Sequence, residues 1–353
     1  MRTRIRGCRT LTTLAGALLA VTTLAVAGCS VDRSTGDSNK PTIRLAYQAF
    51  PSGDLIVKNE GWLEKALPGY NIKWTKFDSG ADINTAFVAK QIDFGAIGSS
   101  PVARGLSAPL NIGYKVAFVL DVAGENEALV ARNGTGITTI ADLKGKRVAT
   151  AFASTSHYSL LAALNHAGVN PADVNLIDLQ PQASLAAWQR GDIDAVYTWL
   201  PTLDELRKTG TTIVTSKEVA TWGKPTLDLG VVSSEFAQQH ADVVDKWRQS
   251  EARALKLIHD DPQAAAKAIA AQLNTTPDDA ANQLKQGIYL TLDQLTSPQW
   301  LGTEGNPGNV AANLFSGAEF LAQQQQIPSA PALETFQKAI YTKGLPDVLT
   351  ATP

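Results

Sequence analysis

Three short segments place hydroxyl side chains at the point where a predicted strand gives way to a predicted helix. They read Phe77-Asp78-Ser79-Gly80, Gly98-Ser99-Ser100-Pro101 and Ser154-Thr155-Ser156-His157. Ser and Thr are common N-caps, and a helix N-terminus carries unpaired backbone N–H groups and a partial positive charge. Several such ends converging would bind an oxyanion without an arginine, and a sulfonate suits them because its three equivalent oxygens accept bonds from different directions. Plain helix capping is the alternative for each segment taken singly.

Aromatic residues near these segments are suited to shield a ligand from water and to offer a ring face to a cation. For each of them, burial in the hydrophobic core is the alternative interpretation. The residues are Tyr47, Phe50, Tyr197, Trp199 and Trp222.

Motifs for metal, cofactor or hydrolase chemistry are missing from the sequence. The histidines, at positions 157, 166, 240 and 259, contain no pair at the i, i+4 spacing that places two metal ligands on one helical face. There is no Walker loop, no Gly-x-Gly-x-x-Gly and no Gly-x-Ser-x-Gly segment. We therefore expect no metal site and no cofactor, and we interpret His157 as a neighbour of its cap or a wall of a pocket.

The elements that must position these residues alternate along the chain. A β-branched and aromatic run from Thr42 to Tyr47 precedes a helical stretch from Leu55 to Leu67, and a second strand-like run follows from Ile72 to Phe77. This alternation predicts an α/β protein. From about Val243 onward the pattern becomes helical, with a break at Gly305 to Gly308.

Two segments repeat one layout of helix end, Ile-Asp, short strand and proline. They are AFVAKQIDFGAIGSSP (Ala86 to Pro101) and AAWQRGDIDAVYTWLP (Ala186 to Pro201). Two related lobes would explain the repeat. Chance is the alternative, because a helix followed by a strand is a common unit.

The first forty residues predict export and attachment to a membrane. Four arginines precede an uncharged run from Leu11 to Ala27, which is typical of a secretory signal and shorter than the roughly 20 residues of a membrane-spanning helix. The end of this run, Val26-Ala27-Gly28-Cys29, resembles the lipobox of bacterial lipoproteins. Cleavage after Gly28 would leave an acylated Cys29 inserted in a membrane leaflet. An ordinary cleaved signal with an incidental cysteine is the alternative.

The composition of the remaining chain limits its cross-links and its partners. Residues 30–40 are almost devoid of apolar side chains and should form a flexible tether. The other cysteine, Cys8, lies in the predicted signal, so no disulfide is available to the mature chain. Removal of residues 1–28 leaves 27 basic and 33 acidic residues, a net charge of about −6, which argues against a nucleic-acid partner.

Most of the mature chain resembles the taurine-binding proteins of bacterial ABC importers, within the nitrate, sulfonate and taurine group of solute-binding proteins. The densest blocks of resemblance are KFDSGADI (76–83), IGSSP (97–101), STSHYSLLAALNHAGV (154–169), LQPQASLAAWQRGDIDAVYTWLP (179–201) and WGKPTLD (222–228).

This resemblance implies a type II periplasmic-binding fold, in which two α/β lobes close on a ligand in the cleft between them. We expect a signal peptide over residues 1–28, a tether over 29–40, lobe 1 over 41–128 and 230–353, and lobe 2 over 129–229. The implied ligand is taurine or a related small sulfonate. The implied partners are an ABC permease and its cytoplasmic ATPase. The protein itself is expected to be a monomer that lipidated Cys29 anchors to the periplasmic or extracellular face of the cell membrane.

The resemblance also assigns roles in the site. Asp228, which ends the block WGKPTLD, is expected to pair with the ligand's ammonium group, and the caps around Ser99, Ser100, Ser154 and Thr155 to hold the sulfonate. The full expected ligand-binding set is Tyr47, Gln48, Asp78, Ser79, Ser99, Ser100, Glu127, Ser154, Thr155, His157, Trp199 and Asp228.

The sequence departs from the family pattern at Phe50, Asp54 and Glu125, which we expect near the cleft. An added carboxylate there would favour a larger or more cationic amine, so an aliphatic sulfonate or another ω-amino acid is the alternative ligand. Pyrimidine-synthesising enzymes of thiamine biosynthesis also resemble this group, but they carry a cysteine-rich motif. No cysteine follows Cys29 in this chain, and an export signal precedes it, so we expect a binding protein and no enzyme.

Overall fold

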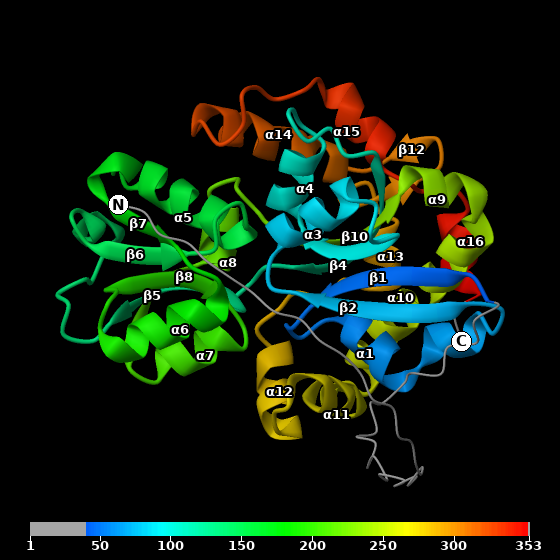
Figure 1. The fold of residues 1–353 in the computed structure, drawn as a ribbon, viewed down its shortest axis with the longest axis horizontal. Helices are drawn as coiled ribbons and strands as arrows, with labels where there is room; N and C mark the ends of the chain where they lie inside the picture. The colour runs from blue at the N-terminus through cyan, green and yellow to red at the C-terminus, as the bar shows by residue number, and fades with distance from the viewer. Residues whose placement is uncertain (1–39, 352–353) are drawn as a thin grey trace, which may run out of the picture. The chain divides into compact units, whose positions relative to one another are not determined.

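The computed structural model describes residues 40–351, so the predicted signal peptide, Cys29 and nearly all of the tether lie outside the described residues. Two five-stranded sheets, here called sheet A and sheet B, organise this part of the chain (Figure 1). Helices separate most of the strands along the sequence, which confirms the predicted α/β class. Among residues 40–351 we find no helix with the length and apolar character needed to cross a membrane.

Sheet A has the spatial order β2-β1-β3-β10-β4. Strand β1 runs parallel to β2 and β3, whereas β10 runs antiparallel to β3 and β4. The strands span Thr42–Gln48 (β1), Asn71–Phe77 (β2), Phe94–Gly98 (β3), Tyr114–Val122 (β4) and Leu227–Ser233 (β10).

Sheet B repeats this plan with the order β7-β6-β8-β5-β9. Strand β6 runs parallel to β7 and β8, and β5 lies antiparallel to β8 and β9. The strands span Glu127–Arg132 (β5), Arg147–Thr150 (β6), Asn175–Asp178 (β7), Ala195–Trp199 (β8) and Gly210–Thr215 (β9). The chain passes between the two sheets at residues 123–126 and again at 216–226, and the predicted lobe boundaries stay a prediction.

The two repeated sequence segments occupy the same place in their sheets, because one contains β3 and the other β8, the third strand in each order. Their Ile-Asp pairs also make the same contact. Asp93 accepts hydrogen bonds from the backbone N, Nε and Nη2 of Arg44, and Asp194 accepts them from the same three atoms of Arg147. Each aspartate thus ties the start of the third strand to the second strand of the same order, which is β1 in sheet A and β6 in sheet B.

Helices lie between the strands of both sheets (Figure 1). With sheet A are α1 (Gly53–Glu60), α2 (Trp62–Ala66), α3 (Gly80–Val88), α4 (Ser99–Gly105), α9 (Ser234–Gln239) and α10 (Ala241–Asp260). With sheet B are the 3-10 turns η1 (Ile140–Leu143) and η2 (Pro171–Asp173) and the helices α5 (Thr155–His166), α6 (Pro181–Arg190), α7 (Thr202–Arg207) and α8 (Ser216–Thr221).

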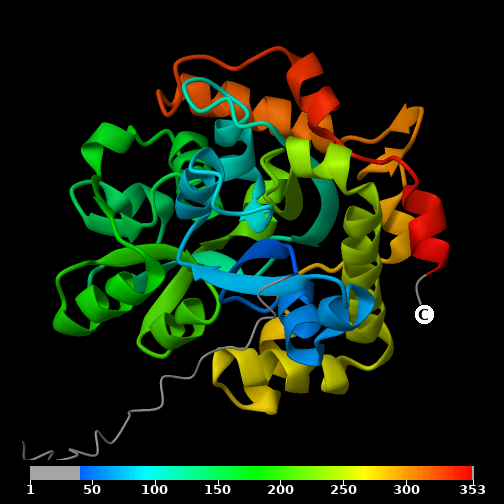
Figure 2. The same ribbon diagram turned by 45° about the vertical axis from the view of Figure 1, so that its right-hand side comes forward.

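The C-terminal part is helical, as predicted from residue 243 onward. It contains α11 (Pro262–Leu273), α12 (Pro277–Leu284), α13 (Leu292–Leu295), α14 (Val310–Gln323), α15 (Leu333–Ala339) and α16 (Leu345–Thr350). The predicted break at Gly305 to Gly308 is a small hairpin of β11 (Gly302–Thr303) and β12 (Asn306–Pro307). Figure 2 shows α16, in red, beside the long helix α10.

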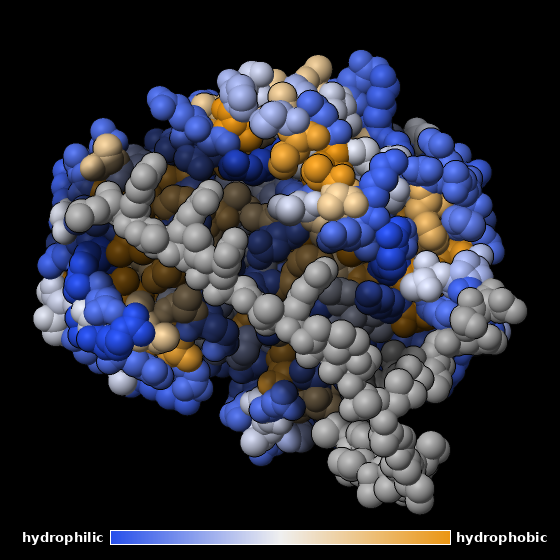
Figure 3. All heavy atoms as spheres, viewed as in Figure 1, coloured by the Kyte–Doolittle hydropathy of each residue, from blue (hydrophilic) through white to orange (hydrophobic). Residues whose placement is uncertain are grey.

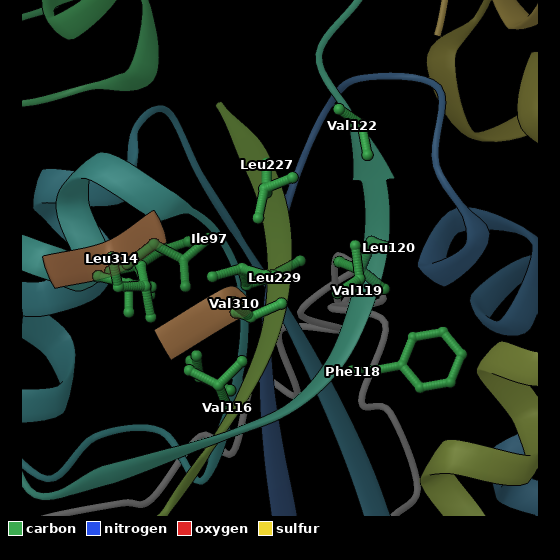
Figure 4. Packing of buried hydrophobic residues seen from close by; sticks show 14 of the residues in the cluster. Ile97, Val116, Phe118, Val119, Leu120, Val122, Leu227, Leu229, Val310 and Leu314 are labelled. Carbon is green, nitrogen blue, oxygen red and sulfur yellow. The ribbon is translucent and has the colours of Figure 1, made fainter. Parts of the chain in front are cut away.

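The core of sheet A is filled from β3, β4, β10 and α14 (Figure 4). Ile97, Val119 and Leu229 on the strands and Val310 and Leu314 on α14 are all at most 1% exposed. Burial of each such side chain contributes about 1.5–3 kcal/mol. The face seen in Figure 3 is mainly hydrophilic, with hydrophobic atoms visible between the polar ones.

Candidate ligand-binding site

A cavity of about 480 Å³, measured to its open mouth, is lined by residues from both sheets and from the crossings between them. It adjoins a wider surface hollow of about 1040 Å³ that shares Gln48, Trp199 and Leu200 with it. The lining residues of the cavity are Gln48, Phe50, Pro51, Gly80, Gly98, Pro101, Ala123, Asn126, Glu127, Ser154, Thr155, Trp199, Leu200 and Asp228.

Glu127, at the start of β5, is held by a shell of hydroxyl groups. Its Oε2 accepts from Thr155 Oγ1 at 2.5 Å and from Ser156 Oγ at 2.8 Å. Its Oε1 accepts from Ser216 Oγ at 2.7 Å and, at longer distance, from Ser159 and Thr226. Burial raises the pKa of Glu127, and these hydroxyl hydrogen bonds oppose the rise because they stabilise the ionised form. A buried carboxylate is thereby fixed in position against the N-terminal turn of α5.

Asp228 is the second carboxyl group of the cavity wall. It lies near the start of β10, directly opposite Asp121 on β4 in the antiparallel register. Asp121 is fully buried behind it and is absent from the cavity lining. Burial, followed by the negative charge of Glu127, raises the pKa of Asp228 to about 7. A cation placed beside Asp228 would reverse this effect, because it stabilises the ionised form.

The charge of the lining is one-sided. Glu127 and Asp228 are the ionisable groups among the residues that line the cavity, and the same set contains no Lys, Arg or His. Bringing a purely anionic ligand into this site would add a negative charge without a countercharge, at a cost of several kcal/mol. A ligand that carries an ammonium group supplies the missing cation together with three hydrogen-bond donors for the carboxyl groups.

Backbone N–H groups at the ends of two helices are available as donors to an anionic group. Gly80 is the first residue of α3 and Thr155 the first residue of α5, so the first turns of both helices begin at the cavity. The cap hydroxyls are already engaged, because Ser79 Oγ accepts from Asp82 N and Ser154 Oγ from His157 N. The first N–H groups of each helix have no intrahelical acceptor and carry the positive end of the helix dipole.

Comparison with known proteins agrees with this arrangement of sheets and cavity. A family model described as NMT1/THI5 like matches residues 56–265. The taurine-binding periplasmic protein of Escherichia coli (strain K12) is 36% identical over 293 residues, which cover 81% of this chain and 88% of that protein. The chain belongs to the NMT1/THI5-like family. The predicted resemblance to taurine-binding proteins is confirmed.

Solved structures confirm the predicted periplasmic-binding fold for this NMT1/THI5-like protein. The alkanesulfonate-binding protein SsuA from Xanthomonas axonopodis pv. citri, bound to MOPS, matches with a TM-score of 0.70 at 20% identity, over 86% of this chain and 99% of SsuA. The desulfurization enzyme DSZB matches with a TM-score of 0.63 at 17% identity, over 88% of this chain and 99% of DSZB. At these identities the likeness shows the fold alone, which hosts both a binding protein and an enzyme.

Six of the twelve residues predicted for the site of this NMT1/THI5-like protein line the cavity. They are Gln48, Glu127, Ser154, Thr155, Trp199 and Asp228. Two more, Tyr47 and Asp78, line the adjoining hollow. The other four, Ser79, Ser99, Ser100 and His157, are buried outside the cavity lining.

The reason is local hydrogen bonding. Ser99 Oγ accepts from Leu227 N at 3.0 Å, so it joins α4 to β10 and does not point into the cavity. His157 Nδ1 accepts from Ala153 N at 3.2 Å, and its ring stacks on Phe152 with a centroid separation of 4.5 Å. Burial lowers the pKa of His157 to about 4, so the ring is neutral and shapes the turn before α5.

Sequence reasoning missed part of the wall. Gly80, Gly98 and Pro101 line the cavity in place of the neighbouring serines. The signal was present in the Gly-Ser-Ser-Pro and Ser-Gly segments, whose glycines allow a close approach of Pro101 to Gly80 and of Thr155 to Gly98. The other missed wall residues are Pro51, Ala123, Asn126 and Leu200. Asn126 Oδ1 accepts from Gly124 N at 2.6 Å, which fixes the crossing from β4 to β5.

The three residues that depart from the family pattern lie in different places in the structure. Phe50 lines the cavity, as expected. Asp54 is buried in the first turn of α1, where it accepts from Ser52 Oγ, and Glu125 pairs with Lys217 at 3.2 Å on the surface. Neither carboxylate belongs to the cavity lining, so our expectation of an added carboxylate facing the ligand is not met. Within residues 40–351, no group of three His, Cys, Asp or Glu is placed to hold a metal ion.

Proposed function

We propose that this NMT1/THI5-like protein is an extracytoplasmic solute-binding protein of an ABC importer and that its ligand is taurine, 2-aminoethanesulfonate. The observation that carries this proposal is the one-sided charge of the cavity. Two carboxyl groups and no cation line it, while two helix N-termini open onto it. A small zwitterion with an ammonium at one end and an oxyanion at the other complements both features.

The ammonium end is assigned to Asp228. A carboxyl group with a raised pKa at a cavity wall gains a charged hydrogen-bond partner when an ammonium binds, and the pair is strengthened by exclusion of water. The oxygens of Glu127 already accept five hydrogen bonds from surrounding hydroxyl groups. Glu127 therefore attracts the ammonium group by its negative charge but does not accept a hydrogen bond from it.

The sulfonate end is assigned to the first turns of α3 and α5. Each helix end is worth about 0.3–1 kcal/mol toward an exposed anion and up to ~2 kcal/mol when partly buried. Three sulfonate oxygens accept from several N–H groups at once, whereas a carboxylate has two oxygens in one plane. Trp199 and Phe50 close the cavity beside them and exclude water.

The size of the ligand limits its affinity. Taurine has about seven non-hydrogen atoms, and a ceiling near −1.5 kcal/mol per atom bounds the binding free energy at roughly −10 kcal/mol. We therefore expect a Kd in the micromolar range or somewhat lower.

An aliphatic sulfonate or another ω-amino acid is the second candidate ligand. The bulky Phe50 in the wall favours it. An alkanesulfonate without an amine would leave Asp228 without a partner, which is why we rank it second.

A binding role is favoured over catalysis. One structural relative is a desulfurization enzyme. From the sequence, a pyrimidine-synthesising enzyme of thiamine biosynthesis is the alternative to a binding protein. Residues 30–353 contain no cysteine, so a thiol nucleophile is unavailable in this part of the chain. We infer that the protein acts as a monomer, held at the membrane by lipidated Cys29, and delivers its ligand to a permease that is driven by a cytoplasmic ATPase.

Calorimetry with four ligands tests the proposal. Taurine, ethanesulfonate, β-alanine and sulfate are titrated into the purified protein at neutral pH. Binding of taurine at least tenfold more tightly than of the other three supports the assignment of both ends. Binding of ethanesulfonate as tight as or tighter than that of taurine would make alkanesulfonates the assigned ligand. Tighter binding of β-alanine would make ω-amino acids the assigned ligand. Failure of all four compounds to bind would refute the proposal.

A further inference from the structure

Asp228 in the cavity wall and the buried Asp121 on the neighbouring strand form a carboxyl pair. They stand opposite each other on β4 and β10, and a β-bulge follows immediately after Asp228 in this pairing. Asp121 is 0% exposed, and neither of its oxygens receives a hydrogen bond from any donor in the described part of the chain. Asp228 in front of it is partly exposed and lines the cavity.

Two ionised carboxyl groups cannot occupy this position together. A carboxylate has no donor, so contact between two of them gives only repulsion, and a buried ion without a partner costs several kcal/mol. A proton on one member removes both penalties, because the acid form donates a hydrogen bond to the carboxylate form. Asp121 is the member that holds the proton, since it is the more deeply buried, while Asp228 faces the space that receives a cation.

The groups around the pair also favour the placement of the proton on Asp121 and of the negative charge on Asp228. Glu127 on β5 and Asp54 on α1 act on Asp121 as further negative charges, and Glu251 on α10 and the phenol of Tyr289 belong to the same buried network. Lys58 is a cation that acts on Asp54, and its Nζ donates a hydrogen bond to Gln272 Oε1 at 2.5 Å, but no cation of residues 40–351 is among the charges that act on Asp121. The negative charges of Asp228, Glu127 and Asp54 thus all disfavour the ionisation of Asp121.

We propose that Asp121 is a positioning residue of the ligand site, which stays in its acid form and donates a hydrogen bond to Asp228, so that the pair presents one fixed negative charge to the ligand. This inference rests on the proposed capture of an ammonium compound. The hydrogen bond occupies one oxygen of Asp228 and leaves the other to the ammonium group. A pair that carries one charge matches a monocation and is unsuited to a divalent metal ion, which would need both groups ionised.

Two substitutions separate the positioning role from a packing role. Asp121→Asn keeps the size and supplies an N–H donor without a titrating proton, whereas Asp121→Leu keeps the bulk and removes the donor. We expect the asparagine variant to bind taurine within about threefold of the wild type. We expect the leucine variant to lose about tenfold to a hundredfold, the effect of one hydrogen bond to a charged group. Thermal unfolding of both variants verifies that they fold.

The proton itself is measured without any ligand. Infrared difference spectroscopy of the wild type against Asp121→Asn, at neutral pH, should show the C=O stretch of one protonated carboxyl group that is lost in the variant. Absence of that band overturns the inference, and so does wild-type taurine affinity in a folded Asp121→Leu variant. Failure of the wild type to bind taurine in calorimetry would instead refute the proposed function, while the infrared band still decides whether the proton is present.

Discussion

Gly98, the last residue of β3, lies directly against Thr155, the first residue of α5. A β-carbon added at position 98 would stand 2.5 Å from Thr155 Cγ2, closer than two carbon atoms can approach. Gly98 belongs to sheet A, whereas α5 is packed with sheet B, so this contact joins the two halves of the cavity wall. The backbone of β3 can reach the N-terminus of α5 only because residue 98 has no side chain.

Gly98→Ala should therefore weaken ligand binding at least tenfold, a cost of about 1.4 kcal/mol, because α5 must move away from β3 to accommodate the methyl group. Calorimetry with taurine measures the change. Gly69→Ala is the matched control, since a β-carbon there meets no atom within 4 Å. An affinity of Gly98→Ala equal to that of the control would mean that the contact with Thr155 is not required in the ligand-bound form.

Asp228→Asn should reduce taurine affinity by two orders of magnitude or more. Removing one partner of a buried ion pair costs about 3–5 kcal/mol, because the ammonium is left without a countercharge. Asp278→Asn on the exposed first turn of α12 serves as the control. A loss of less than twofold would place the ammonium elsewhere in the site.

Taurine affinity should depend on pH through Asp228. Its pKa in the free protein is raised to about 7, mainly by burial, and only the ionised form attracts an ammonium. The affinity should thus be close to its maximum at pH 8 and fall progressively below pH 7, approaching about tenfold for each pH unit. Taurine titrations between pH 5 and pH 8 measure the slope. A flat profile across this range would contradict the role of Asp228 as the titrating partner.

Glu127→Gln should destabilise the ligand-free protein by about 1–3 kcal/mol. The substitution turns one acceptor oxygen into an N–H donor that faces hydroxyl groups which already donate to it. Urea unfolding measures the free energy, and Glu125→Gln is the control, because the exposed pair of Glu125 with Lys217 is worth at most about 1 kcal/mol. Equal stabilities of the two variants would show that the hydroxyl shell rearranges around the amide.

The fold could be predicted from the sequence where a short repeated motif contains a residue that makes the same tertiary contact in both sheets. The repeated Ile-Asp of the two echoing segments pointed to related lobes, and in the structure Asp93 and Asp194 bind their arginines through the same atoms. The arginines themselves could not be paired in advance, because 49 and 47 residues separate them from their aspartates.

The site was predicted less completely, for a physical reason. A hydroxyl at a helix start can cap its own helix or bind a ligand, and Ser99 and His157 satisfy backbone N–H groups of their own surroundings. The sequence does not distinguish these outcomes. Asp121 was missed because its neighbours in β4 are apolar. An aspartate within such an apolar strand is nevertheless a signal, because charged side chains are seldom fully buried without a partner.

Cys29→Ala should release the protein from membranes. Cys29 lies outside the described residues, and the expectation rests on the lipobox-like Val26-Ala27-Gly28-Cys29. Each buried CH₂ of an acyl chain contributes about 0.8 kcal/mol, so an acylated N-terminus holds the chain at the bilayer, whereas the alanine variant has no attachment site for the lipid. Fractionation of cells that produce each form, with detergent extraction of the membrane fraction, measures the partition. Taurine binding should be unchanged in the variant, because residues 30–40 separate the anchor from the first strand. Equal amounts of both forms in the membrane fraction would refute the anchor and favour an ordinary cleaved signal.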